Sequence, residues 1–187
     1  MIENALRFSH TLLKKTISPG DIVVDATVGN GDDTVLLATL VGPHGRVYGF
    51  DIQDQAIKKT KEKLLYTSLL PQVKLYHQGH ETIGTILSAD TPLAGAIFNL
   101  GYLPKSDKSI ITQSNTTLKA MDTLLPMLRK GALLIVVVYY GHEGGNEEKD
   151  AVLDFTSHLP QKEYSVLKYD FINQQNQPPF LLAIEKR

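Results

Sequence analysis

Short apolar runs alternate with longer amphipathic segments along most of the chain, a pattern typical of α/β proteins. β-Branched and apolar runs predict strands at residues 22–26, 46–51, 73–77, 94–99, 132–138, 164–172 and 180–185. Helical periodicity predicts helices at about residues 3–17, 32–41, 53–68, 82–87, 110–129 and 146–159. The elements therefore form five βα repeats followed by two strands joined by a short polar connection.

This order of elements predicts one α/β sheet. Right-handed crossovers make the first five strands parallel, and the short connection between the last two indicates an antiparallel C-terminal hairpin. We expect a seven-stranded, mostly parallel sheet with helices on both faces, in a single domain spanning residues 1–187. Residues 1–20 should form an N-terminal helix packed on the sheet. Pro126 should kink or split the helix predicted at 110–129, since proline lacks the N–H that a helix interior needs.

Composition excludes several classes of protein. No run of 18 apolar residues occurs, and the first residues lack a basic segment followed by an apolar one, so we expect neither a membrane span nor a signal peptide. The chain has no cysteine, and its six histidines show no metal-ligand spacing, so we expect no metal. These features favour a cytoplasmic protein. The net charge of −1 gives no overall basic surface, so any contact with RNA must be a local patch.

The first predicted strand leads directly into a glycine turn. Asp25 ends the strand, Gly29-Asn30-Gly31 follows, and an apolar helix comes next. Such a turn lets backbone approach a ligand, and the helix N-terminus offers unpaired N–H groups. Asp51 ends the second strand 22 residues after Gly29 (51 − 29), close to the spacing at which an acid meets ribose hydroxyls in dinucleotide folds. NAD and S-adenosylmethionine both fit this arrangement, and the alternative is a βαβ unit with a tight turn and a solvent-facing aspartate.

Two residues favour S-adenosylmethionine over NAD. A dinucleotide site wants a small residue where this chain has the β-branched Thr34. The Asp25 carboxylate would repel a pyrophosphate but suits a ligand that carries an ammonium and a sulfonium.

Five motifs in the chain resemble those of one family. They are Asp25-Ala-Thr-Val-Gly-Asn-Gly-Asp-Asp-Thr34, Phe50-Asp-Ile-Gln53, Gly79-His-Glu81, Asn99-Leu-Gly-Tyr-Leu-Pro104 and Tyr140-Gly-His-Glu-Gly-Gly145. The first resembles motif I of class I S-adenosylmethionine-dependent methyltransferases. Together, the five motifs resemble the YtqB-like rRNA methylase family, which includes the MnmM-type tRNA methyltransferases. The resemblance covers nearly the whole chain and implies a Rossmann-like class I methyltransferase fold.

The resemblance also implies a cofactor site at the carboxyl ends of the strands. Asp51 would bind the ribose hydroxyls, and Gln53 or Ile52 would flank the adenine. His80 stands where many relatives carry an acid that contacts the adenine amine, so either His80 or Glu81 would make that contact; a capping histidine is the alternative for His80. The residues expected to bind S-adenosylmethionine are Asp25, Thr27, Gly29, Asn30, Gly31, Asp32, Asp51, Gln53, Gly79, His80, Glu81 and Asn99.

The candidate catalytic residues are Asn99, Tyr102 and His142. Asn99-Leu-Gly-Tyr102 resembles the Asn-Pro-Pro-Tyr motif of methyltransferases that act on amino nitrogens, with both prolines replaced. The alternatives are a turn-forming Asn99 and a core or rim Tyr102. His142 is the first candidate for a proton acceptor because its usual pKa lies near neutrality, and a surface histidine between glycines is the alternative. The residues expected to bind substrate are Tyr102, Lys105, Lys108, Tyr140, His142 and Glu143.

These observations favour an S-adenosylmethionine-dependent RNA methyltransferase. The resemblance points to tRNA, at the aminomethyl nitrogen of a modified wobble uridine at position 34, with rRNA as the alternative RNA. Three competing hypotheses are a small-molecule or protein N-methyltransferase, a non-catalytic cofactor-fold protein and an NAD-dependent dehydrogenase. We also expect a homodimer, because the chain carries no appended RNA-binding module.

Overall fold

The computed structural model describes residues 1–101 and 111–187. The strands are β1 (Ile22–Asp25), β2 (Arg46–Asp51), β3 (Val73–His77), β4 (Leu93–Leu100), β5 (Leu128–Val138), β6 (Tyr164–Tyr169) and β7 (Phe180–Lys186). The helices are α1 (Ala5–Thr16), α2 (Asp32–Val41), α3 (Asp54–Tyr66), α4 (Ile83–Ile86), α5 (Ser114–Met127) and α6 (Gly145–Ser157). Two 3-10 turns, η1 (Leu70–Gln72) and η2 (His80–Thr82), precede β3 and α4.

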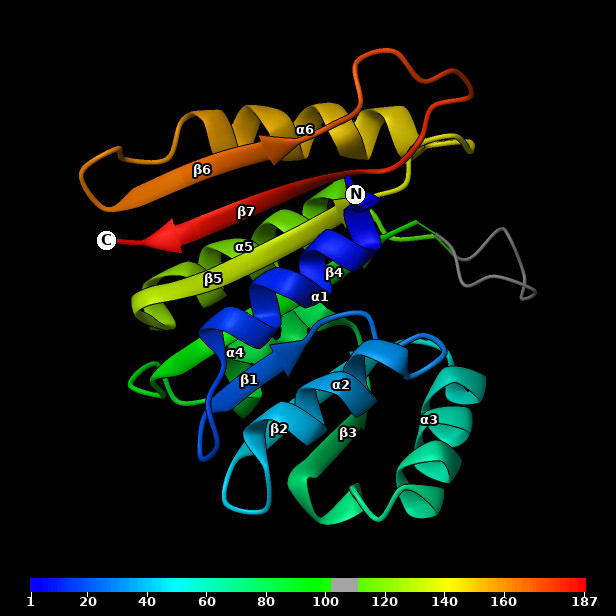
Figure 1. The fold of residues 1–187 in the computed structure, drawn as a ribbon, viewed down its shortest axis with the longest axis vertical. Coiled ribbons are helices and arrows are strands. Elements are labelled where there is room, and N and C mark those ends of the chain that lie inside the picture. The colour runs from blue at the N-terminus through cyan, green and yellow to red at the C-terminus, as the bar shows by residue number, and fades with distance from the viewer. Residues whose placement is uncertain (102–110) are drawn as a thin grey trace.

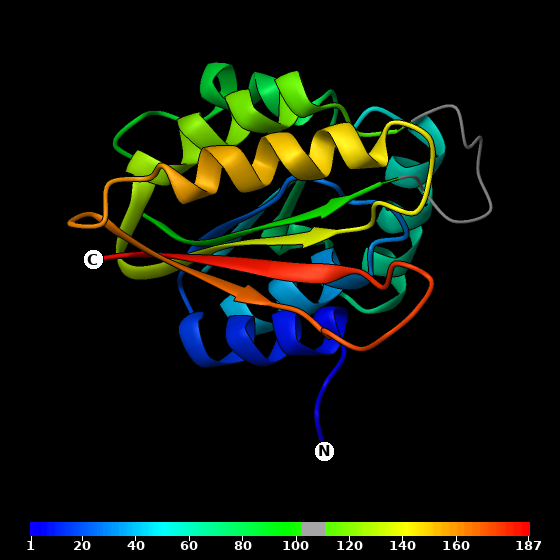
Figure 2. The ribbon, with the colours of Figure 1, turned by 90° about the horizontal axis from the view of Figure 1, so that it is seen from above.

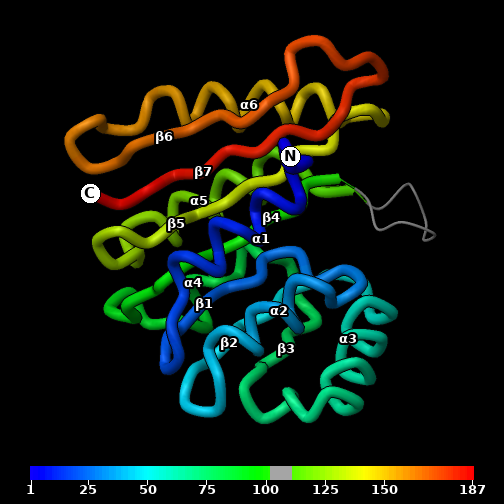
Figure 3. Tube along the Cα trace, viewed as in Figure 1, coloured from blue at the N-terminus to red at the C-terminus, as the bar shows by residue number. Residues whose placement is uncertain are grey.

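The seven strands form one sheet in the order β3-β2-β1-β4-β5-β7-β6. The first five strands pair in parallel, and β7 lies antiparallel to both β5 and β6. The expected fold class, including the antiparallel C-terminal hairpin, is therefore confirmed. The parallel strands all point toward the right-hand edge of the sheet in Figure 1, and the Cα trace in Figure 3 follows the same path. Their carboxyl ends thus share one edge, where ligands bind in open α/β sheets.

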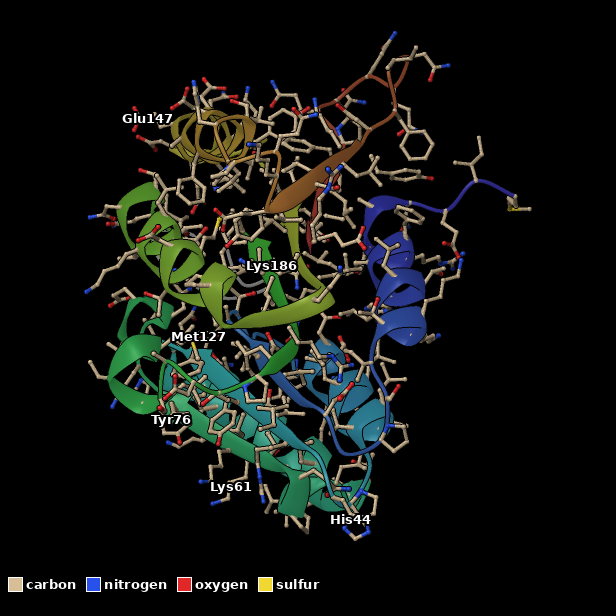
Figure 4. The ribbon with its side chains drawn as sticks, turned by 90° about the vertical axis from the view of Figure 1, so that its left-hand side faces the viewer. His44, Lys61, Tyr76, Met127, Glu147 and Lys186 are labelled. Atoms are coloured by element: carbon tan, nitrogen blue, oxygen red, sulfur yellow. The ribbon has the colours of Figure 1, made fainter. Side chains whose placement is uncertain are left out.

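Helices cover both faces of the sheet (Figure 2). One face packs against α4, α5 and α6 through a core that includes Phe98 and Val136. The other face packs against α1, α2 and α3 through a core that includes Ile97 and Ile135. Seen along the sheet in Figure 4, α1 lies opposite α4 and α5. Neighbouring residues of a strand thus face different helix layers. This alternation determines which side chains at the ends of the strands can contact each other.

The largest differences from the predicted bounds lie in α5, β5 and β6. Helix α5 runs unbroken from Ser114 to Met127 with Pro126 in its last turn, so the predicted split of this helix does not occur. A proline at that point removes only one of the last helical hydrogen bonds, and β5 begins directly afterwards at Leu128 rather than at 132. At the outer edge of the sheet, β6 ends at Tyr169, earlier than the predicted 172.

Within residues 1–101 and 111–187, no helix combines the length and the apolar character that a membrane span requires. The same part of the chain brings together no group of three or more histidine or acidic side chains that could hold a metal ion.

Candidate active site

The glycine turn after β1 adopts backbone conformations that favour glycine. Gly29 has φ +53° and Gly31 has φ +80°, and α2 begins at the next residue. A Cβ atom on Gly31 would lie 2.5 Å from the Thr60 hydroxyl oxygen. The turn therefore packs closely against α3, while Gly29 and Asn30 remain partly exposed at the carboxyl edge of the sheet.

A comparison of two glycine substitutions, one in this turn and one outside it, should separate the cost of backbone strain from the cost of steric clash. Gly31→Ala combines a strained φ with overlap on Thr60, whereas Gly20→Ala, at φ +92°, meets no atom within 4 Å. We expect Gly20→Ala to lower the free energy of unfolding by about 1–2 kcal/mol through strain alone. Gly31→Ala should lower it by a further ~1–3 kcal/mol because a packed neighbour must move. Denaturant unfolding without cofactor measures the loss of free energy of unfolding in each variant. Equal losses would show that the Thr60 side chain moves aside with no energetic penalty.

Asp51 joins the glycine turn to the end of β2. One carboxylate oxygen accepts a hydrogen bond from the backbone N–H of Gly29 at 2.8 Å, and the other accepts from the N–H of Gln53 at 2.8 Å. The side chain is only partly buried, and each oxygen keeps a second lone-pair direction. Asp51 is thus held rigidly and can still accept hydrogen bonds from a sugar diol. Beside it, the Ile52 side chain is 57% exposed, as a residue flanking an adenine ring would be.

Asp25 does not face the ligand edge, which corrects the expectation of direct contact with a cationic ligand. Its side chain is fully buried and accepts hydrogen bonds from the Thr27 N–H at 3.2 Å and from the Thr34 hydroxyl at 2.6 Å. Burial, together with the neighbouring charge of Asp33, raises the pKa of Asp25 to about 7. Asp25 therefore supports the turn from below, and the β-branched Thr34 is one of its two hydrogen-bond donors.

The raised pKa of Asp25 predicts a loss of stability as pH rises. The folded protein keeps this carboxyl protonated up to about pH 7, whereas its ordinary pKa is 3.8. Between these pH values the folded state binds more protons than the unfolded state. The contribution of the Asp25 carboxyl to the free energy of unfolding is therefore greatest at low pH. That contribution should fall by up to about 1.4 kcal/mol per pH unit. Asp25→Asn removes this dependence, so its free energy of unfolding should rise relative to wild type between about pH 5 and pH 7. Denaturant titrations at several pH values measure the difference in free energy of unfolding between Asp25→Asn and wild type. A difference that does not change with pH would contradict the raised pKa of Asp25.

His80 is also buried, which corrects its expected contact with adenine. Its Nδ1–H donates to the Ala26 carbonyl at 3.0 Å, and its ring meets the edge of Phe98 at a centroid distance of 5.5 Å. Burial lowers the pKa of His80, which favours the neutral imidazole. The helical turn that begins at His80 has Gly79 at its N-cap position and no side-chain cap hydrogen bond, so His80 is not a capping residue either. Glu81 is only partly buried, and its carboxylate lies over Gly79, so it is the acid available at this rim.

Two lysines of α3 hold the outer side of the glycine turn. Lys59 Nζ donates to Asn30 Oδ1 at 2.7 Å, and Lys63 Nζ lies 2.5 Å from a carboxylate oxygen of Asp32. The side chains of Asn30 and Asp32 are thus directed toward α3. Their predicted contribution to a cofactor site therefore rests on their backbone groups rather than on their side chains.

The end of β4 meets α1 and α2 through a chain of hydrogen bonds. The Asn99 side-chain amide donates from Nδ2 to Asp33 Oδ2 at 2.6 Å, and His10 Nε2 lies 2.5 Å from Asp33 Oδ1. The Asn99 backbone N–H donates to the Thr27 hydroxyl at 2.7 Å, which ties β4 to the glycine turn. Asn99 is therefore an anchored residue beside the turn and not merely a turn former. His10 and Asp33 were not among the residues expected at the site.

At the end of β5, strand alternation separates the two tyrosines. Tyr140 lies on the α6 side, where its ring packs against Phe180 and under Lys149. Tyr139 lies on the opposite side, is 37% exposed and contacts the region of Gly101. Burial, and secondarily the charge of Asp33, raises the pKa of Tyr139. Tyr139, which sequence reasoning missed, is thus the tyrosine on the Asn99 side, and the expectation that Tyr140 faces a substrate is not supported by its packing.

The remaining expected residues are placed as follows. The His142 ring lies beside Gly101 and Gly145, within the carboxyl edge of the sheet, and Glu143 is exposed. Tyr102, Lys105 and Lys108 lie outside the described residues.

A buried carboxylate links the elements behind the site. Glu148, only 3% exposed in the first turn of α6, accepts from the Thr117 hydroxyl at 2.7 Å and from the Thr112 hydroxyl at 2.5 Å. The Thr112 hydroxyl in turn accepts from the Gly101 N–H at 2.9 Å. This arrangement fixes the end of β4 to α5 and α6. No local sequence signal identifies Glu148, because its partners Thr112 and Thr117 lie more than 30 residues earlier, in α5 and just before it.

Comparison with protein families places this chain. Residues 47–185 match the family described as "Putative rRNA methylase". The chain belongs to this family. It is 36% identical to the "tRNA (mnm(5)s(2)U34)-methyltransferase, chloroplastic" of Arabidopsis thaliana, over 98% of this chain and 70% of that protein.

Solved structures of relatives agree with the family assignment. A "putative rRNA-methylase" from Clostridium thermocellum superposes with a TM-score of 0.97 at 46% identity, covering all of both chains. SMU.1697c from Streptococcus mutans, solved in complex with SAH, superposes with a TM-score of 0.92 at 44% identity, also covering all of both chains. The protein is therefore an S-adenosylmethionine-dependent methyltransferase, as the sequence predicts.

The residues at the edge of the sheet fit this cofactor. A close-packed glycine turn, a rigid Asp51 and an exposed Ile52 offer places for the methionyl, ribose and adenine parts of the molecule. The charges of Asp33 and Asp51 both act on Asp25, so three carboxyl groups surround the turn. Asp25 is buried and its pKa is raised to about 7, so the charges of Asp33 and Asp51 are the ones that disfavour the pyrophosphate of NAD and favour a cation.

Proposed function

We propose that the protein methylates the aminomethyl nitrogen of a modified wobble uridine, at position 34 of tRNA, with S-adenosylmethionine as the methyl donor. The observation that carries this proposal is the anchored amide of Asn99 at the carboxyl edge of the sheet. Because Nδ2 donates to Asp33, the Oδ1 atom remains to accept a hydrogen bond from an amine. The identity to the Arabidopsis relative, named for the same nucleoside, supports tRNA over rRNA.

The chemistry requires alignment and the loss of a proton. The bound cofactor supplies a methyl group on a sulfonium, which is a good leaving group. In the transfer, a nitrogen–carbon bond forms as the carbon–sulfur bond breaks, and S-adenosylhomocysteine leaves. Asn99 Oδ1 would hold the amine in line, and most of the rate enhancement would come from this positioning. An alkylamine is mostly protonated at neutral pH, so it must first lose a proton; His142, at the same edge, is the proposed acceptor.

We propose that Tyr102, Lys105, Lys108, His142 and Glu143 bind the substrate. Tyr102 would stack on the base, and stacking contributes roughly 1–3 kcal/mol per base. Lys105 and Lys108 would contact phosphates, and His142 and Glu143 would contact the target nucleotide. The net charge of −1 requires such a local patch. A homodimer would enlarge the RNA-binding surface, and a cytoplasmic location remains a prediction, since the Arabidopsis relative is named as chloroplastic.

Methyl transfer to undermodified tRNA tests the proposal. The protein is incubated with methyl-labelled S-adenosylmethionine and tRNA from a strain that lacks it, and the nucleosides are separated by mass spectrometry. We expect label on the wobble nucleoside and none on ribosomal RNA offered in parallel. Label on ribosomal RNA alone would favour the rRNA alternative. Activity that does not fall steeply with salt would favour a small-molecule substrate, because phosphate contacts are lost at high ionic strength.

A further inference from the structure

A three-residue chain of hydrogen bonds crosses from α1 through α2 to the end of β4. His10 of α1 meets Asp33 of α2 at 2.5 Å, and Asp33 meets Asn99 of β4 at 2.6 Å. The Asp33 side chain is only 9% exposed, and that of His10 is 27% exposed. The helices α1 and α2 lie on the same face of the sheet as Asn99, because Asn99 has the same strand parity as Ile97.

Chemistry fixes the direction of each hydrogen bond in this chain. An ionised carboxylate only accepts hydrogen bonds, whereas an asparagine side chain presents NH₂ at one end and an oxygen at the other. The group that faces Asp33 must therefore be the NH₂ of Asn99, and the nitrogen of His10 that faces Asp33 must carry a proton. With both Asp33 oxygens engaged, the Asn99 amide cannot turn over without placing its oxygen against a carboxylate.

We propose that Asp33, supported by His10, is a positioning residue that locks the Asn99 amide with Oδ1 toward the substrate. The expected effect on kcat rests on the proposed function, whereas the orientation of the Asn99 amide does not depend on it. A locked acceptor selects a target atom that carries a hydrogen, as an amine nitrogen does. An amide free to turn could instead present its NH₂, which would donate to the lone pair of the neutral amine and occupy the electron pair that must attack the methyl group.

Asp33→Asn is the sharpest variant, because it keeps the shape of the side chain while it removes the charge and the acceptor-only character. An asparagine at 33 can donate to Asn99 as well as accept from it, so both orientations of the Asn99 amide become allowed. It also removes the charge of Asp33 that raises the pKa of Asp25, so the fold should not be weakened. We expect kcat for methyl transfer to fall about tenfold, while the Kd for S-adenosylmethionine changes less than about threefold.

A matched control comes from the other end of the molecule. Asp154 lies on α6 beside His158 at 3.5 Å, in an exposed Asp–His pair remote from the glycine turn. Asp154→Asn makes the same chemical change and should leave kcat and Kd unaltered. At position 10, His10→Gln retains an N–H donor and should stay near the wild-type rate, whereas His10→Leu cannot donate and should lose activity by about threefold.

Amide NMR reports the orientation without any substrate. In wild type, the Asn99 side-chain NH₂ signals, assigned by their absence in Asn99→Ala, should exchange slowly with water. In Asp33→Asn they should shift and exchange faster. Fast exchange in wild type would overturn the lock, whatever the substrate proves to be. Loss of cofactor affinity in Asp33→Asn equal to the loss of kcat would make Asp33 a cofactor ligand instead, and an unchanged kcat would also overturn the proposal. Failure of tRNA methylation with a slow-exchanging Asn99 amide would reject only the proposed substrate.

Discussion

Asp51→Ala should weaken the binding of S-adenosylmethionine by about 100-fold. The substitution removes the charged acceptor for the ribose hydroxyls, and hydrogen bonds to charged groups contribute roughly 1.5–3 kcal/mol each. It also frees the N–H groups of Gly29 and Gln53, which the carboxylate holds at 2.8 Å, so the glycine turn loses its tie to β2. A factor of 100 corresponds to about 2.8 kcal/mol, within the range of roughly 1.5–3 kcal/mol for one such bond. Titration calorimetry with the cofactor measures the change.

A neighbouring aspartate provides the control for this result. Asp54 begins α3 three residues later (54 − 51) and forms an exposed i,i+4 ion pair with Lys58. Asp54→Ala should leave cofactor affinity unaltered, because an exposed pair of this kind contributes little. Asp51→Asn should fall between the two, since an amide can accept one of the two backbone N–H bonds but faces the other with its own N–H groups. An unchanged affinity in Asp51→Ala would remove the proposed ribose contact.

Asn99→Ala should lower kcat by about 100-fold while cofactor affinity changes less than about threefold. The substitution leaves the backbone bond from residue 99 to the Thr27 hydroxyl in place, so the end of β4 should stay attached to the glycine turn. It removes the oxygen that would align the amine, and misplacement of a reacting group by about 1 Å can cost 10²-fold. Single-turnover methylation of undermodified tRNA, together with calorimetry, separates the two effects.

Asn115→Ala is the matched control, because Asn115 is exposed in the first turn of α5. It should retain full activity. If Asn99→Ala kept its rate, the amide would have no part in holding the amine. If the cofactor affinity of Asn99→Ala fell as much as its rate, Asn99 would act chiefly by binding the cofactor. The sequence also predicts that role for Asn99.

The residues that sequence reasoning placed well share one property: their signals are local. The glycine turn, the aspartate that ends β2 and the asparagine that ends β4 each follow a strand that apolar runs predict. Parallel strands bring such ends to one edge, so strand prediction alone gathers Gly29, Asp51 and Asn99. The same reasoning could not tell which neighbouring side chain turns outward and which turns inward.

The sequence by itself thus determined the α/β order of elements, the edge of the sheet that holds the site and the family to which the chain belongs. Only the tertiary structure decided that Asp25 and His80 are buried supports, that Tyr139 rather than Tyr140 lies on the same face of the sheet as Asn99, and that Asp33 links His10 to Asn99. The reason is physical: burial and the pairing of polar side chains depend on the packing of helices distant in sequence. His10 and Asp33 are 23 residues apart, and Asp33 and Asn99 are 66 apart, so no local pattern could record their contact.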